Sequence, residues 1–331
     1  MPRRPSILWF VLIVATLSIS VMTVAIRARP ITTIGDLIIA VGAPYITVTI
    51  ALLCAAFVLV LRRRLLPIVA LCAALGAVAV QVPWYYFASA PEVGTSADIR
   101  ILSSNLRLGR ADATSFVAVA RQSADVITVS ELTPAAVKRF TEAGLDTEFP
   151  HSVLLPAGGA GGIGLYSRHP LTEISPGEPR DYTMAAARVQ IPGVLTDPTV
   201  ASVHVESPVS SNRDTVAQWR IGIGAVKAAM TAFIVSAGPG AVIIAGDFNS
   251  TPDERQFRDL MTNGYRDAVE QTGSGFAPTF PSRTWHPPLL TIDHIITRNA
   301  AAQSIKTVFI PGSDHRALLA TIEVPLDPGA A

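Results

Sequence analysis

The residues of this sequence best suited to chemistry are a carboxylate and an amide that follow a short apolar run. The run 241–244 leads into Gly246, and a short apolar segment that stops at a glycine is typical of an interior strand. Asp247 and Asn249 stand two positions apart, so an extended backbone points both side chains the same way. The C-terminal end of such a strand is where open α/β sheets place their reactive groups. A turn in which both side chains satisfy local backbone amides is the alternative interpretation.

Further acids, amides and histidines close other apolar segments. They are Asn105, Glu131, His204, Asp293 and the pair Asp314-His315. Each alone has a structural explanation: an acid can cap the helix that follows it, Ser-Asp is a good turn pair, and a lone histidine on a strand is usually a satisfied buried residue. Together they favour a shared site, because several unpaired acids are costly to bury side by side unless a bound cation offsets the cost.

Alternating strand-type and helix-type segments must position these residues. Helices are predicted at 111–122, from Thr133-Pro134 onward, and at 212–236. Strands are predicted at 99–105, 125–131, 163–168, 185–190, 199–206, 241–244, 290–296 and 317–324.

The N-terminal part of the chain has the composition of a membrane domain. The 331 residues are 50% hydrophobic and only 15% charged, which is too apolar for an ordinary soluble protein. Three apolar spans, 7–26, 37–61 and 65–88, each reach the ~20 residues that cross a bilayer. The first is too long for a signal peptide and lacks a clear small-residue cleavage site, so it is interpreted as an uncleaved anchor. We therefore predict a membrane domain over 1–90, a linker over 91–97 and a catalytic domain over 98–331.

Arginines at the ends of the spans predict how the chain is oriented in the membrane. Arg3, Arg4 and 62–64 are on one side of the predicted membrane, and Arg27 and Arg29 are on the other. Because the side richer in Lys and Arg faces the cytoplasm, three crossings place the second domain outside the cell. If only two spans insert, the domain lies inside.

Charge and cysteine content limit the function classes. From Asp98 onward, 19 basic and 23 acidic residues give a charge of −4, which disfavours nucleic-acid binding without excluding a local basic patch. Both cysteines, Cys54 and Cys72, lie in the apolar spans, so the second domain has neither a disulfide nor thiol chemistry.

The ordered motifs between 99 and 324 resemble the endonuclease/exonuclease/phosphatase superfamily. The motifs that carry the resemblance are Ser104-Asn105, Val129-Ser130-Glu131, Gly164-Leu165-Tyr166-Ser167-Arg168, Val203-His204, Gly246-Asp247-Phe248-Asn249, Ile292-Asp293-His294-Ile295 and Gly312-Ser313-Asp314-His315. The resemblance implies an α/β (α+β) four-layer sandwich of two mixed β-sheets flanked by helices. In this chain three transmembrane helices would precede it.

The resemblance also implies a metal-dependent hydrolase that acts on phosphate ester bonds. Its chief metal ligand would be Glu131, with Asn105 beside it and Asp314 at a further metal-binding position. Mg²⁺ or Mn²⁺ would be the cofactor, since the sequence holds no Cys–His cluster with zinc spacing and a phosphate ester needs a hard, oxygen-preferring cation.

The remaining residues match catalytic positions of the family. Asp247 would orient or deprotonate the attacking water, and Asn249 would help to fix the phosphate. Asp293 and His315 match an acid–imidazole pair, and His204 matches a histidine that contacts the phosphate. Hydrogen bonds from two imidazoles would stabilise the negative charge that develops on the phosphate oxygens.

Several functions stay open at this point. The leading hypothesis is an outward-facing, membrane-anchored phosphodiesterase or phosphatase, whose substrate is either a lipid headgroup or a nucleic acid. The apolar loop Trp285–Leu290 either covers the core or dips into the membrane interface, and the sequence leaves both interpretations open. A non-catalytic binding module is a further alternative, because Ser130 stands where the family often has Gln and Thr291 where it often has Arg.

Overall fold

The computed structural model describes residues 7–61, 65–174, 184–194, 196–210, 215–283 and 285–327. Contacts between Cα atoms divide the chain into two compact units. The first, the helical unit, comprises Met1–Trp84 and the segment Pro252–Arg258. The second, the catalytic unit, comprises Tyr85–Thr251 and Asp259–Ala331.

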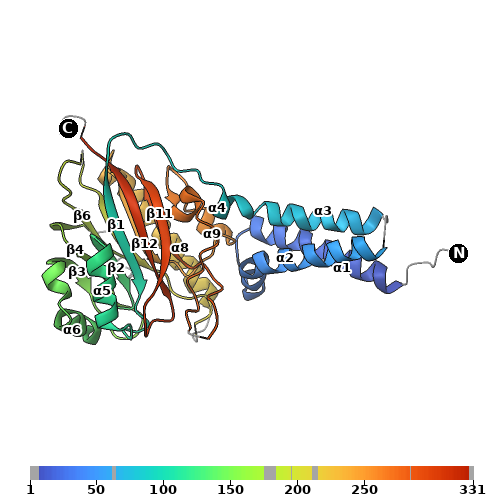
Figure 1. Cartoon of the computed structure of the whole chain (residues 1–331), viewed down its shortest axis with the longest axis horizontal. Helices are drawn as coiled ribbons and strands as arrows, with labels where there is room; N and C mark the ends of the chain where they lie inside the picture. Colours follow the sequence, from blue (N-terminus) through green and yellow to red (C-terminus); the bar gives the residue numbers. More distant parts are fainter. Residues whose placement is uncertain are drawn as a thin grey trace. The chain divides into compact units, whose positions relative to one another are not determined.

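Three apolar helices lie side by side in the helical unit (Figure 1). They are α1 (Ile7–Ala28), α2 (Ile34–Leu61) and α3 (Leu65–Ala79). Their common core contains Ile13, Ile50, Cys54, Ala70 and Ala74. The segments Ile7–Ala28 and Ile34–Val60 are long and apolar enough to cross a membrane. Arg3, Arg4 and 62–64, on which the predicted orientation rests, lie outside the described residues.

The third apolar helix is shorter than the predicted span 65–88. α3 has 15 residues, about 22 Å at 1.5 Å per residue, against a hydrocarbon core of about 30 Å. A turn at Val80-Gln81 and the short helix α4 (Val82–Tyr86) follow it. Pro83 explains the break, because a proline lacks the N–H that a continuous helix needs and is tolerated in a first turn.

The third helix with the length and hydropathy of a membrane span is α8 (Thr215–Ala237), in the catalytic unit. Its buried residues, which include Trp219, Ile223, Val226 and Met230, recur at the helical period and face β7 and β8. α8 is therefore a core helix of the catalytic unit.

Two six-stranded mixed sheets form the centre of the catalytic unit. The first has the order β11-β12-β1-β2-β4-β3 and the second β5-β6-β7-β8-β10-β9. The strands of the first sheet are β1 (Ser96–Asn105), β2 (Val126–Ser130), β3 (His151–Leu155), β4 (Ile163–Ser167), β11 (Ala301–Phe309) and β12 (Arg316–Pro325). Those of the second are β5 (Leu171–Ile174), β6 (Met184–Val189), β7 (Thr199–His204), β8 (Val242–Asp247), β9 (Arg266–Asp267) and β10 (Asp293–Arg298).

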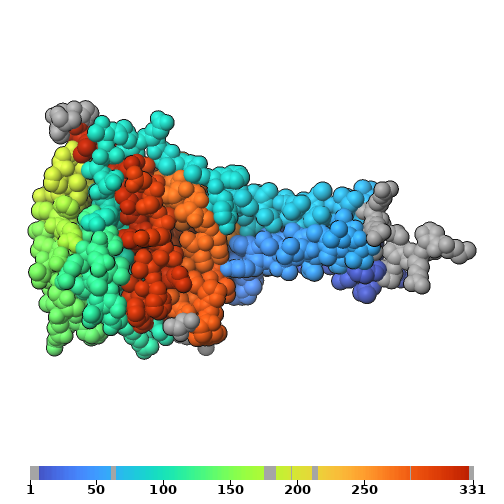
Figure 2. All heavy atoms as spheres, viewed as in Figure 1, coloured from blue at the N-terminus to red at the C-terminus, as the bar shows by residue number. Residues whose placement is uncertain are grey.

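The first and last long strands of the unit are neighbours. β1 pairs with β12 in antiparallel register from Ser96↔Pro325 to Ser103↔Leu318. In the space-filling view, the red atoms of the C-terminal strands lie beside the teal atoms of the segment that begins the unit (Figure 2). The sheet therefore closes only after almost the whole chain is present.

The two sheets pack face to face, and helices cover their outer faces. Ser202 Oγ of β7 donates to the Val129 carbonyl of β2 across 3.1 Å, and β1, β2 and β4 contact strands of the second sheet. On the outer face of the first sheet lie α5 (Ala113–Ser123), α6 (Pro134–Glu142) and α7 (Leu145–Glu148). α8 covers the second sheet, and α10 (Ala268–Thr272) packs beside β10 and β11. The predicted four-layer sandwich is confirmed.

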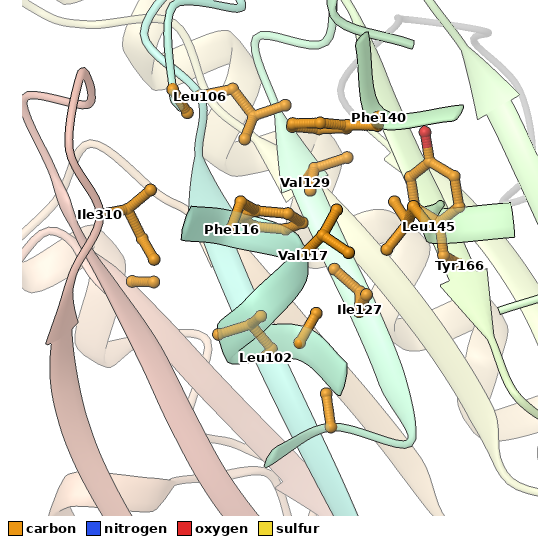
Figure 3. Close-up of a cluster of buried hydrophobic side chains, with 14 of the residues drawn as sticks. Leu102, Leu106, Phe116, Val117, Ile127, Val129, Phe140, Leu145, Tyr166 and Ile310 are labelled. Atoms are coloured by element: carbon orange, nitrogen blue, oxygen red, sulfur yellow. The ribbon is translucent and has the colours of Figure 1, made fainter. Parts of the chain in front are cut away.

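A cluster of buried aromatic and aliphatic side chains fixes α5 and α6 on the first sheet (Figure 3). Phe116 of α5 stacks on Phe140 of α6 with ring centroids 4.9 Å apart, and both are fully buried. Burial of each ring contributes about 1.5–3 kcal/mol. Asp112 and Thr133 cap the two helices by accepting hydrogen bonds from Ser115 N and Ala136 N. These helices therefore hold the loops that follow β1 and β2.

Candidate active site

Strand β8 brings a carboxylate, a histidine and a second carboxylate into one row. Asp247, the last residue of β8, is in register with His204 at the end of β7 and with Asp293 at the start of β10. β7 runs parallel and β10 antiparallel to β8, so all three side chains belong to the same edge of the second sheet. Residues 43 and 46 positions away from Asp247 are thus placed beside it by strand register alone.

Gly246 permits the close approach of β7 and β8 next to this row. A Cβ atom at this position would lie 2.0 Å from the Val203 carbonyl oxygen, far inside van der Waals contact with the backbone. Its φ of +156° is also disfavoured for residues with a side chain. The glycine before Asp247 is therefore a steric requirement of the site.

The first sheet contributes an amide and a carboxylate from the ends of neighbouring parallel strands. Asn105 ends β1, and Glu131 directly follows the last residue of β2. Asn105 Nδ2 donates to Glu131 Oε1 at 3.0 Å and to Asp247 Oδ2 at 2.9 Å, so the amide bridges the two sheets. Its oxygen, the atom that would ligate a cation, accepts from Arg107 N at 2.8 Å. One amide nitrogen therefore contacts two carboxylates, one from each sheet.

Glu131 is held in a backbone conformation that is costly for a residue with a side chain. Its φ is +56°, in the left-handed region, and this conformation turns the carboxylate back toward the end of β1. There Glu131 Oε2 accepts from Leu108 N at 2.5 Å. With Asn105 on the other oxygen, both carboxylate oxygens have fixed partners. Strain of this kind typically marks functional positions.

The orientation of His204 is set by a glycine-rich loop. His204 Nδ1 lies 3.0 Å from the Ala160 carbonyl oxygen, which can only accept, so Nδ1 carries a proton. Nε2 then faces the carboxylates, at 3.9 Å from both Glu131 Oε1 and Asp247 Oδ2. The ring thus presents one nitrogen to the space between two acids.

His315 and Asp293 form a buried acid–imidazole pair. His315 Nδ1 lies 2.8 Å from Asp293 Oδ2, and Nε2 lies 3.8 Å from Asp247 Oδ2. Burial by itself disfavours the imidazolium, but the charges of Asp293 and Asp247 outweigh it and raise the pKa of His315 to about 10. The imidazolium form of His315 is therefore favoured, and its Nδ1 donates to Asp293.

The surroundings of Asp247 disfavour the charged form of its carboxyl group. Its side chain is 1% exposed, and burial, followed by the charge of Asp293, raises its pKa. Asp247, Asp293 and His315 offer ligand atoms within 4.8 Å of one another. Glu131 Oε1 and Asp247 Oδ2 are further carboxylate oxygens of this site, each 3.9 Å from His204 Nε2. Closely spaced oxygen donors with excess negative charge fit a hard divalent cation.

Two predicted site residues lie at the edge of this group. Asn249 has φ +45°, and its Nδ2 donates to the Val205 carbonyl at 2.8 Å, which ties the loop after His204 to the loop after Asp247. Asp314 is one-third exposed and pairs with Arg107 Nε at 3.6 Å. Asp314 therefore lies at the rim of the site, beside His315 in the chain.

Five supporting contacts were not predicted from the sequence. Ser313 Oγ donates to the Asn105 carbonyl at 2.7 Å and accepts from His315 N at 3.0 Å, so it links the end of β1 to the loop that precedes β12 in the same sheet. The Phe280 ring lies 4.8 Å from the His315 ring. Leu108 N and the Ala160 carbonyl hold Glu131 and His204. Of these residues, only Ser313 and Ala160 lie in segments that the sequence pattern marks, the Ser-Asp-His motif and the glycine-rich segment 158–162.

A family model described as "Endonuclease/Exonuclease/phosphatase family" matches residues 102–315, and the chain belongs to this family. Its members are metal-dependent phosphoester hydrolases, so the protein is a metal-dependent hydrolase that acts on phosphate ester bonds. The match begins at β1 and ends at His315, and thus contains every residue of the site described above.

Solved structures share the fold at low identity. D. rerio TDP2 complexed with single-strand DNA product is 16% identical, with a TM-score of 0.52 over 68% of this chain and 99% of that one. The endonuclease/exonuclease/phosphatase from Bacteroides vulgatus is 16% identical, with a TM-score of 0.53 over 69% and 99%. An AP endonuclease from Archaeoglobus fulgidus is 12% identical, with a TM-score of 0.54 over 67% and 98%. A search of curated proteins gives no match.

Proposed function

We propose that the protein is a membrane-anchored, Mg²⁺-dependent phosphodiesterase or phosphatase. The observation that carries this proposal is the position of Asp247, whose Oδ2 is 2.9 Å from Asn105 Nδ2, 3.8 Å from His315 Nε2 and 3.9 Å from His204 Nε2. One carboxylate thus faces an amide and two imidazoles drawn from both sheets. This combination suits the activation of water beside an anionic phosphate.

Glu131 and Asp247 would hold the cation, with Asn105 orienting both carboxylates. When bound, a divalent cation screens the negative charge of the phosphate and polarises its oxygens. Mg²⁺ or Mn²⁺ would serve, because both ions accept the oxygen donors assigned to the site. Asp314, one-third exposed and paired with Arg107, would serve as a further ligand only for an ion bound at the rim.

Proton transfer and phosphate binding are assigned to separate groups. Asp247 accepts a proton from the attacking water or orients it. Asn249, whose Nδ2 donates to the Val205 carbonyl at 2.8 Å, would help to fix the phosphate. The phosphate oxygens then need donors on the opposite side.

His315 and His204 face the phosphate from that side, and His204, with its Nδ1–H on Ala160, donates from Nε2 only as the imidazolium. The imidazolium of His315, held by Asp293, donates from Nε2 to a phosphate oxygen as negative charge develops. His204, whose Nδ1–H is fixed on Ala160, presents Nε2 to the same region. Asp293 acts through His315 by keeping its ring oriented and protonated.

The direct test is hydrolysis of bis(p-nitrophenyl) phosphate by the full chain in detergent with Mg²⁺. Asp247→Ala should lower the rate by about 10²–10⁴-fold, the usual contribution of a positioned acid–base group. Asp259→Ala, at an acid outside the site, is the matched control and should retain the rate. Equal rates for the wild type and Asp247→Ala would reject the proposal.

The catalytic unit is proposed to lie on the outer face of the cell membrane. The excess of arginine at Arg3, Arg4 and 62–64 over Arg27 and Arg29 supports this, provided that 65–88 completes a third crossing. Protease added to intact cells should then cleave the catalytic unit. Complete protection in intact cells, with cleavage after lysis, would place the unit inside.

A nuclease is the second candidate function. It is favoured by the relatives whose structures are described as TDP2 with single-strand DNA product and as an AP endonuclease. The charge of −4 from Asp98 onward argues against extended phosphate tracking. Release of nucleotides from single-stranded DNA, at a rate above that for bis(p-nitrophenyl) phosphate, would favour this alternative.

A further inference from the structure

Three loops that carry the active site also expose apolar side chains. Leu108, whose N–H binds Glu131, is 42% exposed, and Val209, five residues after His204, is 67% exposed. Trp285 and Leu289, in the loop before Asp293, are 74% and 47% exposed. We call these four residues the apolar rim. Single exposed aliphatic residues are common, but a largely exposed tryptophan in the same loop as an exposed leucine points to an interaction site.

Direct contacts attach these loops to the reactive residues. Ser282 N, three residues before Trp285, donates to the Asp314 carbonyl at 2.6 Å, and the Phe280 ring lies against His315. Asn249 holds the loop that leads to Val209 through the Val205 carbonyl. The apolar rim therefore surrounds the same ends of the two sheets as the site.

Two arginine residues lie close to residues of the apolar rim. The Arg283 guanidinium lies 5.7 Å from the centroid of the Trp285 ring. Arg107, next to Leu108 in the chain, pairs with Asp314 at 3.6 Å and remains 44% exposed at its side chain. An indole ring suits the boundary between acyl chains and headgroups, and a guanidinium beside it suits the headgroup phosphates.

The apolar helices of the chain bring the catalytic unit to a lipid surface. α1 and α2 have the length and hydropathy of membrane spans, so the catalytic unit is tethered to a bilayer. A tether raises the effective concentration of the bilayer at the rim, so a few apolar contacts suffice for binding. Nucleic acid would need a row of phosphate-tracking cations, which the charge of −4 does not favour.

We propose that the apolar rim and Arg283 contact the lipid bilayer and that the site hydrolyses a phosphate ester carried by a lipid. This inference rests on the proposed phosphoesterase function and specifies its substrate class. In the reaction, the oxygen of water bonds to phosphorus, the bond from phosphorus to the leaving alcohol oxygen breaks, and a proton from water passes to that oxygen.

Contact of Trp285 with lipid can be measured without turnover. The full chain is placed in nanodiscs of phosphatidylcholine and phosphatidylglycerol, with or without brominated acyl chains, and the fluorescence of Trp285→Phe is subtracted from that of the wild type. The difference signal, which reports Trp285 alone, should lose most of its intensity in brominated discs. An equal difference signal in both kinds of disc would overturn the proposal.

Substrate class is measured as a ratio of rates in proteoliposomes. The rate on phosphatidylglycerol divided by the rate on bis(p-nitrophenyl) phosphate should fall roughly tenfold in the double variant Trp285→Ala/Leu289→Ala, because the apolar contacts that hold the rim at the interface are lost. Val235→Ala, an exposed apolar residue on α8, is the matched control and should keep the wild-type ratio. An unchanged ratio in the double variant would contradict the proposal.

The outcomes separate this inference from the proposed function. Hydrolysis of bis(p-nitrophenyl) phosphate or DNA, together with no lipid turnover and no bromolipid quenching, would retain the hydrolase and remove the lipid substrate. Absence of hydrolysis with every ester would overturn the proposed function and the lipid-substrate inference together. The quenching experiment would still decide whether the rim contacts lipid.

Discussion

Asn105 Nδ2 donates a hydrogen bond to Asp247 Oδ2 at 2.9 Å, and this bond joins the last residue of β1 to the last residue of β8. It is one of the contacts by which the two sheets share a single site. The same nitrogen also binds Glu131, so one amide sets the separation of two carboxylates that would otherwise repel each other.

Removal of this amide should reduce activity more than it reduces folding. A hydrogen bond to a charged group contributes about 1.5–3 kcal/mol, so Asn105→Ala should lower kcat/KM by roughly 10- to 100-fold. Gln303→Ala is the matched control, because Gln303 makes an amide–carboxylate bond to Glu323 on an exposed part of β11 and β12. Equal kcat/KM values for both variants and the wild type would contradict the assigned orienting function.

The His315–Asp293 pair should produce a pH-dependent stability in the metal-free protein. The folded-state pKa of about 10 lies above the ordinary value of about 6.5. The stabilisation is therefore fully present below about pH 6.5 and is lost as the pH rises through 10. The His315 ring proton, followed by NMR on the full chain in detergent with EDTA, should titrate near pH 10. In Asp293→Asn it should titrate closer to the ordinary value.

Added Mg²⁺ should raise the thermal midpoint of the protein, since a ligand that binds only the folded state stabilises it by RT ln(1 + [L]/Kd). Glu131→Gln should abolish this rise, because the change removes one of the two carboxylates assigned to the cation. Glu142→Gln, at an exposed glutamate that pairs with Lys138, should keep the rise. Differential scanning calorimetry with and without Mg²⁺ measures both, and a full response in Glu131→Gln would exclude Glu131 as a ligand.

Gly246→Ala should severely destabilise the catalytic unit. The added Cβ would lie 2.0 Å from the Val203 carbonyl, and neither backbone can move without breaking the register of β7 and β8. Overpacking of this kind costs typically 1–3 kcal/mol, and a backbone clash lies at the upper end. Gly224→Ala on α8, where a Cβ meets nothing within 4 Å, should instead be neutral or stabilising by up to about 1 kcal/mol. Thermal unfolding of the two variants gives the comparison.

Arg27→Ala should destabilise the helical unit. Arg27 ends the apolar stretch of α1 and pairs with Asp253, whose side chain is 2% exposed, and it donates to the Pro252 carbonyl at 2.9 Å. Breaking a buried pair on one side costs about 3–5 kcal/mol, because the remaining charge stays buried. Arg29→Ala, at a side chain that is 59% exposed, should cost less than about 1 kcal/mol. Similar thermal midpoints for the two variants would rule out a structural role for the Arg27–Asp253 pair.

The sequence predicted the C-terminal ends of two site strands because an apolar run that stops at a polar residue carries a strong local signal, whereas the strand predicted at 290–296 lies at Asp293–Arg298. Asn105 ends β1 and Asp247 ends β8, as the run lengths indicated. Distances between them follow from strand order and register, which depend on contacts more than a hundred residues apart. The role of Ser313 as a link between Asn105 and His315 therefore had no local signal beyond its motif.

For the predicted third span, the sequence pattern did not show where the helix ends. Hydropathy continues through 65–88, but the helix ends at Ala79 because a turn and Pro83 interrupt it. Hydropathy also qualifies α8 as a span, although its buried side chains at helical spacing face the sheet. Composition alone does not distinguish lipid from a protein core as the surroundings of an apolar helix.

Because Pro252–Arg258 belongs to the helical unit, the two parts of this unit are synthesised at different times. Arg27 leaves the ribosome 226 residues before its partner Asp253, and Ile31 leaves 225 residues before Gln256, whose side chain binds it. At about 5–20 residues per second, translation of that interval takes roughly 10–45 s. The first helix must therefore persist in the nascent chain with its terminal cation unmatched, and this unit reaches its final form only after most of the protein has been made.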